Sequence, residues 1–256
     1  MPVTSAHARS WASEAAGVSY ELGRPDYPAE LNDLLGEYAG VGPTSRVADV
    51  AAGTGKLTRV LARRPCTLIA VEPMPGMRSQ LRRAVPAALA VAGTAEALPL
   101  RTASIDTVTV AQAFHWFHIE RASRELRRVL APGGNLVLVN NTQISTEPLG
   151  GRLWRVLQRF EELAPRPEGT RGWRPRLESA GDFEHWGHFE LRHEQVLANP
   201  TELEARFMSV SFVLLLSEAD RARLAAAVRE VASDHYPIRF PLRTVIDIGR
   251  RAAGPA

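Results

Sequence analysis

The chain has a single cysteine, Cys66, and a single lysine, Lys56, among its 256 residues. One cysteine cannot form a disulfide bond within the chain. Long apolar runs are also missing: residues 212–216 form one of the longest, far short of the roughly 20 apolar residues that a membrane span needs. The N-terminus begins Met-Pro-Val-Thr-Ser and lacks the apolar core of a signal peptide. We therefore expect a cytoplasmic protein with no membrane partner.

The charge pattern does not indicate a nucleic-acid-binding protein, although the net charge is +3 and the isoelectric point is about 9.5. In residues 124–128, three arginines are interleaved with Glu125, and Glu120 lies close by. Such mixing is typical of a solvated helix face. The hydrophobic fraction of 45% suffices for a full core, so we expect one domain that carries an elaboration. The sequence does not predict an oligomeric state.

The most informative segment is residues 47–58, with the sequence VADVAAGTGKLT. An apolar run ends in the Gly53-Thr-Gly55 turn and continues into a helix-forming segment. Two glycines let the backbone bend sharply and approach a ligand closely. Glu72 stands at the end of the next apolar run, where an acid can accept hydrogen bonds from both hydroxyls of a ribose. This pattern predicts a nucleotide-cofactor site.

Three classes of cofactor use such a turn. A P-loop needs an earlier glycine where Val50 stands and a hydroxyl where Leu57 stands, so that class is excluded. The interpretation as a dinucleotide site is weakened but not excluded, because Thr58 stands in place of the third glycine and the Lys56 side chain lies at the start of the helix. Asp49 would repel a pyrophosphate but suits the ammonium and sulfonium of S-adenosylmethionine (SAM). The loop therefore favours a cationic nucleoside without phosphates.

Six segments in order resemble one family, the class I SAM-dependent methyltransferases, and within it the methyltransferase type 11 and trans-aconitate methyltransferase-like subgroup. The resemblance is detailed from about residue 20 to residue 141 and general beyond that. The segments are residues 20–28 (YELGRPDYP), 49–55 (DVAAGTG), 71–77 (VEPMPGM), 93–100 (GTAEALPL), 105–117 (IDTVTVAQAFHWF) and 128–134 (RVLAPGG).

Apolar periodicity predicts strands that alternate with helices, and hence an α/β fold with a parallel sheet. Residues 132–134, Pro-Gly-Gly, should end a helix and turn into the fifth strand. The resemblance implies a Rossmann-like, mostly parallel seven-stranded sheet with an antiparallel last strand, helices on both faces and a cap insertion after the fifth strand. The expected strands are residues 46–51, 67–71, 87–92, 105–112, 135–140, 183–197 and 236–250; the expected helices include residues 55–64, 119–130, 153–163, 201–208 and 217–233.

We expect a single methyltransferase domain over residues 1–256. Its predicted parts are a helical, cofactor-covering N-terminal segment (residues 1–45), a SAM-binding core (46–141), a cap (142–182), and C-terminal strands and helices (183–256). The cap would cover the carboxyl edge of the sheet and hold a small-molecule acceptor. Seven side chains in or beside the cap either line an aromatic or anionic acceptor pocket or lie on the surface of a mobile flap: Trp154, Arg171, Trp173, Arg174, His185, Trp186 and His188. We expect no metal, because His185 and His188 have no evident third ligand.

The resemblance also implies roles for individual residues. Arg24, next to Tyr20, would clasp the SAM carboxylate, and Asp49 would order the loop and face the methionine portion. Thr94 stands where the family commonly has an acid, so the resemblance leaves undecided whether a side chain contacts adenine there. Met74 either packs on adenine or belongs to the core. The expected cofactor-binding residues are Tyr20, Arg24, Asp49, Ala51, Gly53, Gly55, Glu72, Pro73, Met74, Thr94, Ala95, Glu96, Gln112 and Ala113.

His115 follows the fourth strand and is the candidate catalytic residue, since imidazole titrates near neutrality. A role in the cofactor pocket or scaffold is the alternative. The expected reaction is in-line transfer of the SAM methyl group to an oxygen or nitrogen of a small molecule, with S-adenosylhomocysteine (SAH) as the product. The alternatives are a SAM-binding protein without catalysis and, less favoured, an NAD(P)-dependent oxidoreductase.

Overall fold

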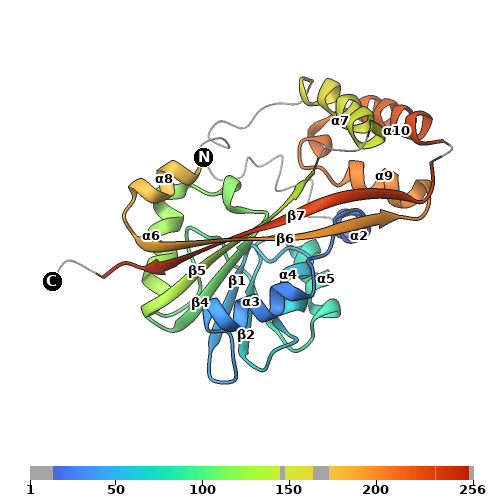
Figure 1. Ribbon diagram of the computed structural model, residues 1–256. Helices are drawn as coiled ribbons and strands as arrows, with labels where there is room; N and C mark the ends of the chain where they lie inside the picture. Colours follow the sequence, from blue (N-terminus) through green and yellow to red (C-terminus); the bar gives the residue numbers. More distant parts are fainter. Residues whose placement is uncertain (1–13, 145–147, 164–172, 234, 254–256) are drawn as a thin grey trace.

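A seven-stranded sheet organises the protein (Figure 1). The computed structural model describes residues 14–144, 148–163, 173–233 and 235–253. The sheet order is β3-β2-β1-β4-β5-β7-β6; strands β1 to β5 run parallel, and β7 is antiparallel to both of its neighbours. This confirms the predicted fold class. The strands are β1 Arg46–Val50, β2 Thr67–Val71, β3 Leu89–Val91, β4 Ile105–Ala111, β5 Leu130–Gln143, β6 Phe183–Leu197 and β7 Ile238–Arg251.

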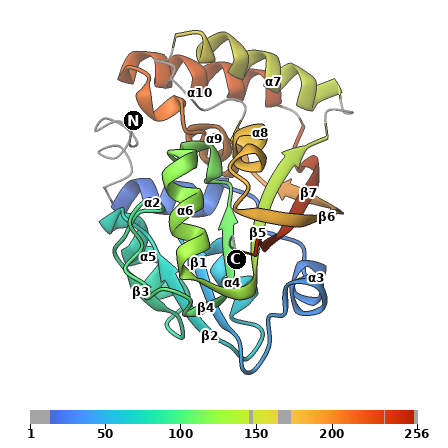
Figure 2. The same ribbon diagram turned by 90° about the vertical axis from the view of Figure 1, so that its left-hand side faces the viewer.

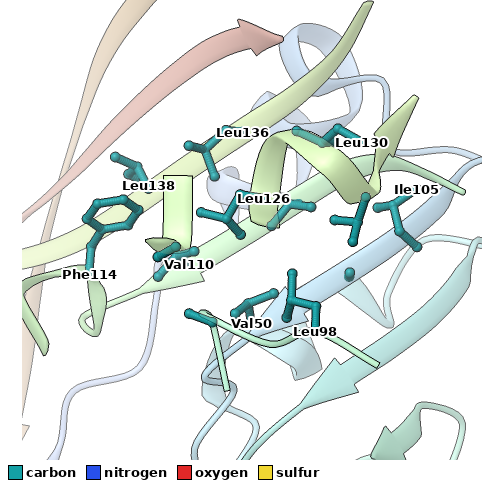
Figure 3. Packing of buried hydrophobic residues seen from close by; sticks show 14 of the residues in the cluster. Val50, Leu98, Ile105, Val110, Phe114, Leu126, Leu130, Leu136 and Leu138 are labelled. Atoms are coloured by element: carbon teal, nitrogen blue, oxygen red, sulfur yellow. The ribbon is translucent and has the colours of Figure 1, made fainter. Parts of the chain in front are cut away.

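Each face of the sheet is covered by helices, which explains why the central strands read as continuous apolar runs. Alternate residues of β5 point to opposite cores: Leu136 and Leu138 belong to one, and Val137 and Val139 to the other. The first core packs against α6 (Ile119–Val129) through Leu126 (Figure 3). The second packs against α3 (Glu30–Ala39), α4 (Lys56–Leu61) and α5 (Pro75–Ala84). The sheet is therefore fixed on both faces.

A third core lies beyond the carboxyl edge of the parallel strands. Strands β6 and β7 extend past the rest of the sheet and carry three helices there (Figure 1): α7 (Pro148–Glu161), α9 (Pro200–Met208) and α10 (Glu218–Ala232). Leu153, Leu203 and Leu224 from these helices pack with Phe240 of β7. Helices α7 and α10 lie side by side (Figure 2). These elements form a cap with its own hydrophobic core.

The cap groups elements differently from the predicted division of the chain. Helix α8 (Trp173–Ser179), expected within the cap insertion, packs against α6 instead. Helices α9 and α10, expected among the C-terminal elements, pack with α7. At the start of the chain, α2 (Glu14–Gly23) packs against α9 and α5. The division at residue 182 thus does not coincide with the packing of the helices.

The Pro-Gly-Gly segment does not precede the fifth strand as expected. Helix α6 ends at Val129, and β5 begins at Leu130, which is fully buried and pairs with Ile105. The next pair is Thr107 with Asn135, so residues 131–134 form a bulge within the strand. Gly133, with φ of +75°, supplies the left-handed backbone that the bulge needs. The predicted start of the fifth strand was wrong, because Leu130 already pairs with Ile105 before the Pro-Gly-Gly turn.

The other expected elements are confirmed to within a few residues at their ends. In the described part of the chain, no helix is both long enough and apolar enough to cross a membrane.

Candidate functional site

The turn after β1 has the backbone that the two glycines predict. Gly53 and Gly55 have φ of +59° and +92°, and Ala51 also has a positive φ, of 56°. A Cβ at Gly55 would lie 3.3 Å from Leu81 of α5, whereas one at Gly53 would meet nothing within 4 Å. Gly55 therefore serves the packing of helix on helix. The open side of Gly53 faces a cavity, where a ligand can approach the backbone.

Glu72 ties the end of β2 to this turn. One carboxylate oxygen accepts a hydrogen bond from the Gly53 amide and the other accepts one from the Met74 amide, both at 2.8 Å. Burial raises the pKa of Glu72, while the two amide bonds and Arg78 oppose the rise. Each oxygen retains a lone pair for a further donor, because a carboxylate has about four acceptor sites. Glu72 is thus oriented to receive two hydroxyl groups.

Asp49 lies beneath the turn and is almost completely buried. Its two oxygens accept hydrogen bonds from the hydroxyls of Thr58, at 2.6 Å, and Thr109, at 2.9 Å. Burial raises the pKa of Asp49 to about 6 despite these bonds. In the protein alone, Asp49 therefore orders the loop, and a nearby cation would favour its ionised form.

The N-terminal segment is held over the turn by polar contacts. Glu21 of α2 accepts a hydrogen bond from Thr54, at 2.6 Å, and pairs with Arg59. Lys56, which is largely buried, forms an ion pair of 2.9 Å with Asp26. The single lysine of the chain, at the start of α4, thus connects α4 to the segment that follows α2.

Arg24, just after α2, has an incompletely satisfied side chain. Its Nη2 donates to the carbonyl of Ser209 at 2.7 Å, and its guanidinium lies 5.5 Å from the centre of the Tyr20 ring. Its Nε is buried and has no hydrogen-bond partner among the described residues. Such a buried donor calls for a ligand atom or a water.

A first cavity of about 420 Å³ opens at the carboxyl ends of β1, β2 and β4. All the predicted cofactor residues line it except Asp49 and Gly55, and His115 lines it too. Glu96, in its wall, also accepts a hydrogen bond from the His118 amide at 3.0 Å, which anchors residues 94–96 to the start of α6. The volume is within the range of pockets that hold ligands of cofactor size.

Trp116 and Phe117, which follow His115 in the segment 105–117, line the cavity too, whereas four further lining residues were not predicted from the sequence: Met77, Ala111, Val210 and Ser211. Met77 closes the VEPMPGM segment, so the motif itself was a usable signal. Val210 and Ser211 follow α9, far along the chain, and carry no local signal.

A second cavity of about 510 Å³ lies under the cap. It shares Tyr20, Arg24, Gly53 and Gln112 with the first cavity, so the two meet above the turn. Asp49 borders this cavity only. Gln112 has a positive φ of 54° and donates from its side chain to the Asn141 carbonyl at 2.9 Å. Strained backbone of this kind is concentrated at functional sites. Further lining residues are Lys56, Asn141, Gln143, Trp154, Leu157, Arg206, Phe207 and Leu242.

His115 borders the first cavity and not the second. Burial, together with the positive charge of Arg24, lowers its pKa to about 4. The imidazole is therefore neutral at pH 7 but a weak base. Its role stays a prediction, with the geometry favouring the cofactor pocket over proton removal from an acceptor.

Of the residues predicted for an acceptor pocket, Trp154 alone lines the second cavity; Arg171 lies outside the described residues. Trp173 packs on Phe114, with ring centres 5.1 Å apart. Three others belong to a cluster on β6, β7 and α8: Arg174 and His188 both bind Asp247, and Trp186 lies under Arg174. His185 is largely exposed and lies outside this cluster. In the described ranges, no group of three or more potential metal ligands occurs.

The sheet order, the glycine turn after β1 and the acid after β2 together define a class I SAM methyltransferase fold. The comparisons with known proteins agree. The "Methyltransferase domain" family model matches residues 48–138. An uncharacterised methyltransferase-like protein of Schizosaccharomyces pombe is 35% identical over 221 residues, which cover 83% of this chain and 82% of that protein. The chain therefore belongs to the methyltransferase family.

Two further matches have different extents. An uncharacterised methyltransferase of Mycobacterium tuberculosis is 50% identical over 125 residues, so the match covers 49% of this chain and 50% of that protein. A solved structure of a candidate type II methyltransferase from Anaeromyxobacter dehalogenans has a TM-score of 0.61 at 26% identity, covering 89% of this chain and 96% of the other. These relatives support the family and the fold and leave the acceptor open.

Proposed function

We propose that this protein transfers the methyl group of SAM to an oxygen or nitrogen of a small-molecule acceptor. The observation that carries the proposal is the meeting of two cavities at the carboxyl edge of the sheet. One contains the glycine turn and Glu72, and the other lies under the cap. Ligands of open α/β sheets bind at this edge.

The residues of the first cavity fit SAM. Glu72 would accept the two ribose hydroxyls, and the open side of Gly53 would let the cofactor approach the backbone. The unpartnered Nε of Arg24 would donate to the SAM carboxylate. Asp49, which borders the second cavity beside the turn that the two cavities share, would face the ammonium and the sulfonium, whose positive charges favour its ionised form. The fourteen predicted cofactor residues are retained in this proposal, with Gly55 acting through the packing that shapes the turn.

SAM, when bound, supplies a methyl group that a sulfonium already activates. The protein then has to align an acceptor behind that methyl group and exclude water. In such a transfer the nucleophile's lone pair would form the new bond to carbon as the carbon–sulfur bond breaks, with its electrons left on sulfur. A hydroxyl or amine acceptor also releases a proton. His115, with its pKa lowered to about 4, is poorly suited to take it, so we assign His115 to the cofactor pocket.

The second cavity also favours this function over a SAM-binding protein without catalysis, which would need no room beside the cofactor. Membership of the methyltransferase family argues against the NAD(P)-dependent oxidoreductase. We propose a small acceptor rather than a nucleic acid, because arginines of α6 pair with acids: Arg128 with Glu125 at 2.7 Å, and Arg127 with Asp182 at 3.7 Å. We retain the cytoplasm as the expected location.

Calorimetric titration of the purified protein with SAM, SAH and NADH tests the cofactor. We expect the two adenosyl ligands to bind and NADH not to bind. Glu72→Ala should weaken SAM binding by about 100-fold, because it removes two charge-assisted acceptors. Glu230→Ala, an exposed acid on α10, is the matched control and should leave binding unchanged. Binding of NADH alone would refute the proposal.

The acceptor is then sought by incubating the protein with SAM that carries a labelled methyl group and a library of small molecules. Product formation that depends on Glu72 supports catalysis.

A further inference from the structure

Arg206 is a cation in the wall of the second cavity without a carboxylate partner. It lies on α9, in the cap, and lines the second cavity but not the first. Its side chain is deep in the protein and retains part of its exposure, because it borders the cavity. Among the described residues, no acid forms an ion pair with it.

Neutral groups fix its position. Nη1 donates to the side-chain oxygen of Gln195, and Nη2 donates to that of Gln143 at 3.1 Å. The guanidinium also lies 4.4 Å from the centre of the Phe240 ring. Gln195 in turn donates to the carbonyl of Gly23 at 3.1 Å. These contacts orient the guanidinium without neutralising its charge, and the two hydrogen bonds use two of its five N–H groups.

The electrostatic setting shows the same lack of compensation. Burial lowers the pKa of Arg206 to about 9, with the positive charge of Arg24 acting in the same direction. The side chain is still a cation at pH 7. Two neighbouring arginines without acids are costly in a protein interior. An anion bound at each of them would remove that cost.

The two arginines serve different parts of the site. Arg24 borders both cavities and is the residue that we assign to the carboxylate of SAM. Arg206 borders only the cavity that we assign to the acceptor. Trp154, Leu157 and Leu242 add apolar walls to that cavity.

We propose that the acceptor carries a carboxylate, which Arg206 binds, and an apolar body, which lies against the cap. This inference rests on the proposed function and names the substrate class of the same site. A carboxylate suits the position because one guanidinium, flanked by neutral amides, balances one negative charge and binds a planar anion through parallel N–H groups. A phosphate group would call for a second cation, but Lys56 in the same wall is paired with Asp26, and we assign Arg24 to the SAM carboxylate.

The test uses three carboxylates of increasing size, each with its uncharged amide: acetate, hexanoate and 4-phenylbutanoate. Binding is measured by calorimetry on protein saturated with SAH. We expect at least one carboxylate to bind about 10- to 100-fold more tightly than its amide, the range for hydrogen bonds to charged groups. Arg206→Met should abolish this preference. Arg206→Lys should keep part of it, because lysine keeps the positive charge but lacks the parallel N–H groups of the guanidinium.

The control is Arg229→Met, at an exposed arginine of α10, which should behave like the wild type. SAH affinity and the unfolding temperature of each variant show whether it is folded. If Arg206→Met weakens SAH binding as much as carboxylate binding, Arg206 serves the cofactor and the inference is wrong, while the proposed function stands. If the wild type does not bind SAH, the proposed function itself fails.

Three other results would also overturn the inference: equal binding of carboxylates and amides, an unchanged preference in Arg206→Met, or no binding of any carboxylate. Tighter binding of 3-phenylpropylphosphonate than of 4-phenylbutanoate would assign the cavity to phosphate-like anions instead.

Discussion

Replacing Asp49 by asparagine should stabilise the protein in the absence of SAM while weakening cofactor binding. Asp49 is 1% exposed, and burial raises its pKa to about 6 from an ordinary value of 3.8. A carboxyl group with a raised pKa in the folded state releases its proton more readily when the chain unfolds. Its ionisation therefore favours the unfolded state at neutral pH.

The magnitude follows from the size of the shift. A difference of about 2 pKa units corresponds to about 3 kcal/mol, at 1.36 kcal/mol per unit. The wild type has this stability of about 3 kcal/mol only below about pH 4, where Asp49 is protonated in both the folded and the unfolded state. The wild type loses it as the pH rises to about 6 and does not regain it at higher pH. The asparagine side chain of the variant would not ionise. The hydroxyls of Thr58 and Thr109 can each rotate to donate or accept, so both hydrogen bonds can re-form around the amide.

Urea unfolding of the two proteins at several pH values between 4 and 8 measures the effect. We expect Asp49→Asn to gain about 2 to 3 kcal/mol over the wild type at pH 8, with the gain shrinking toward pH 4. Its affinity for SAM should fall about tenfold or more, because the negative charge facing the cofactor is gone. A variant that is less stable than the wild type at pH 8, or a difference that does not change with pH, would refute this account of Asp49.

Two further changes test the packing of α2 on α9 and the ion pair of His188 with Asp247. Gly23→Ala should lower the free energy of unfolding by about 1 to 3 kcal/mol, because the new Cβ would lie 2.1 Å from the Ala205 carbonyl between α2 and α9; Gly42→Ala, where a Cβ meets nothing within 4 Å, is the control for urea unfolding. The pKa of His188 is raised, chiefly by its hydrogen bond to Asp247. The ion pair of protonated His188 with Asp247 therefore makes a small contribution to stability below pH 6.5, and this contribution is lost as the pH rises through the raised pKa. His188→Ala should therefore differ from the wild type at pH 6 and match it at pH 9 in thermal unfolding, whereas equal differences at both pH values would contradict the ion-pair account; His185→Ala, on an exposed side chain, should match at both.

The residues that belong to local sequence motifs are the ones that the structure brings together around the first cavity. Gly53, Glu72 and Gln112 each follow a buried strand, and parallel strands bring their carboxyl ends to one edge. Prediction was poorer where a role depends on distant packing. Trp186 and His188 lie in a segment rich in aromatic and polar side chains, but their strand turns them toward α8 and Asp247 rather than the cavity.

Arg206 illustrates the same limit. The chain contains many arginines, and nothing near Arg206 in the sequence distinguishes it from an arginine whose side chain is exposed to solvent. Its importance arises because the long strands β6 and β7 carry α9 back over the sheet, where Gln143, Gln195 and Phe240 surround the guanidinium.

The sequence by itself determined the order of strands and helices, the turn after β1 and the acid after β2, because hydrophobic periodicity and glycine geometry act over a few residues. The tertiary structure alone decided which helices form the cap, that a second cavity joins the first, and which charges remain unpaired inside it. Those features depend on side chains brought together from distant parts of the chain, and a charge without a partner becomes recognisable only when all its neighbours are in place.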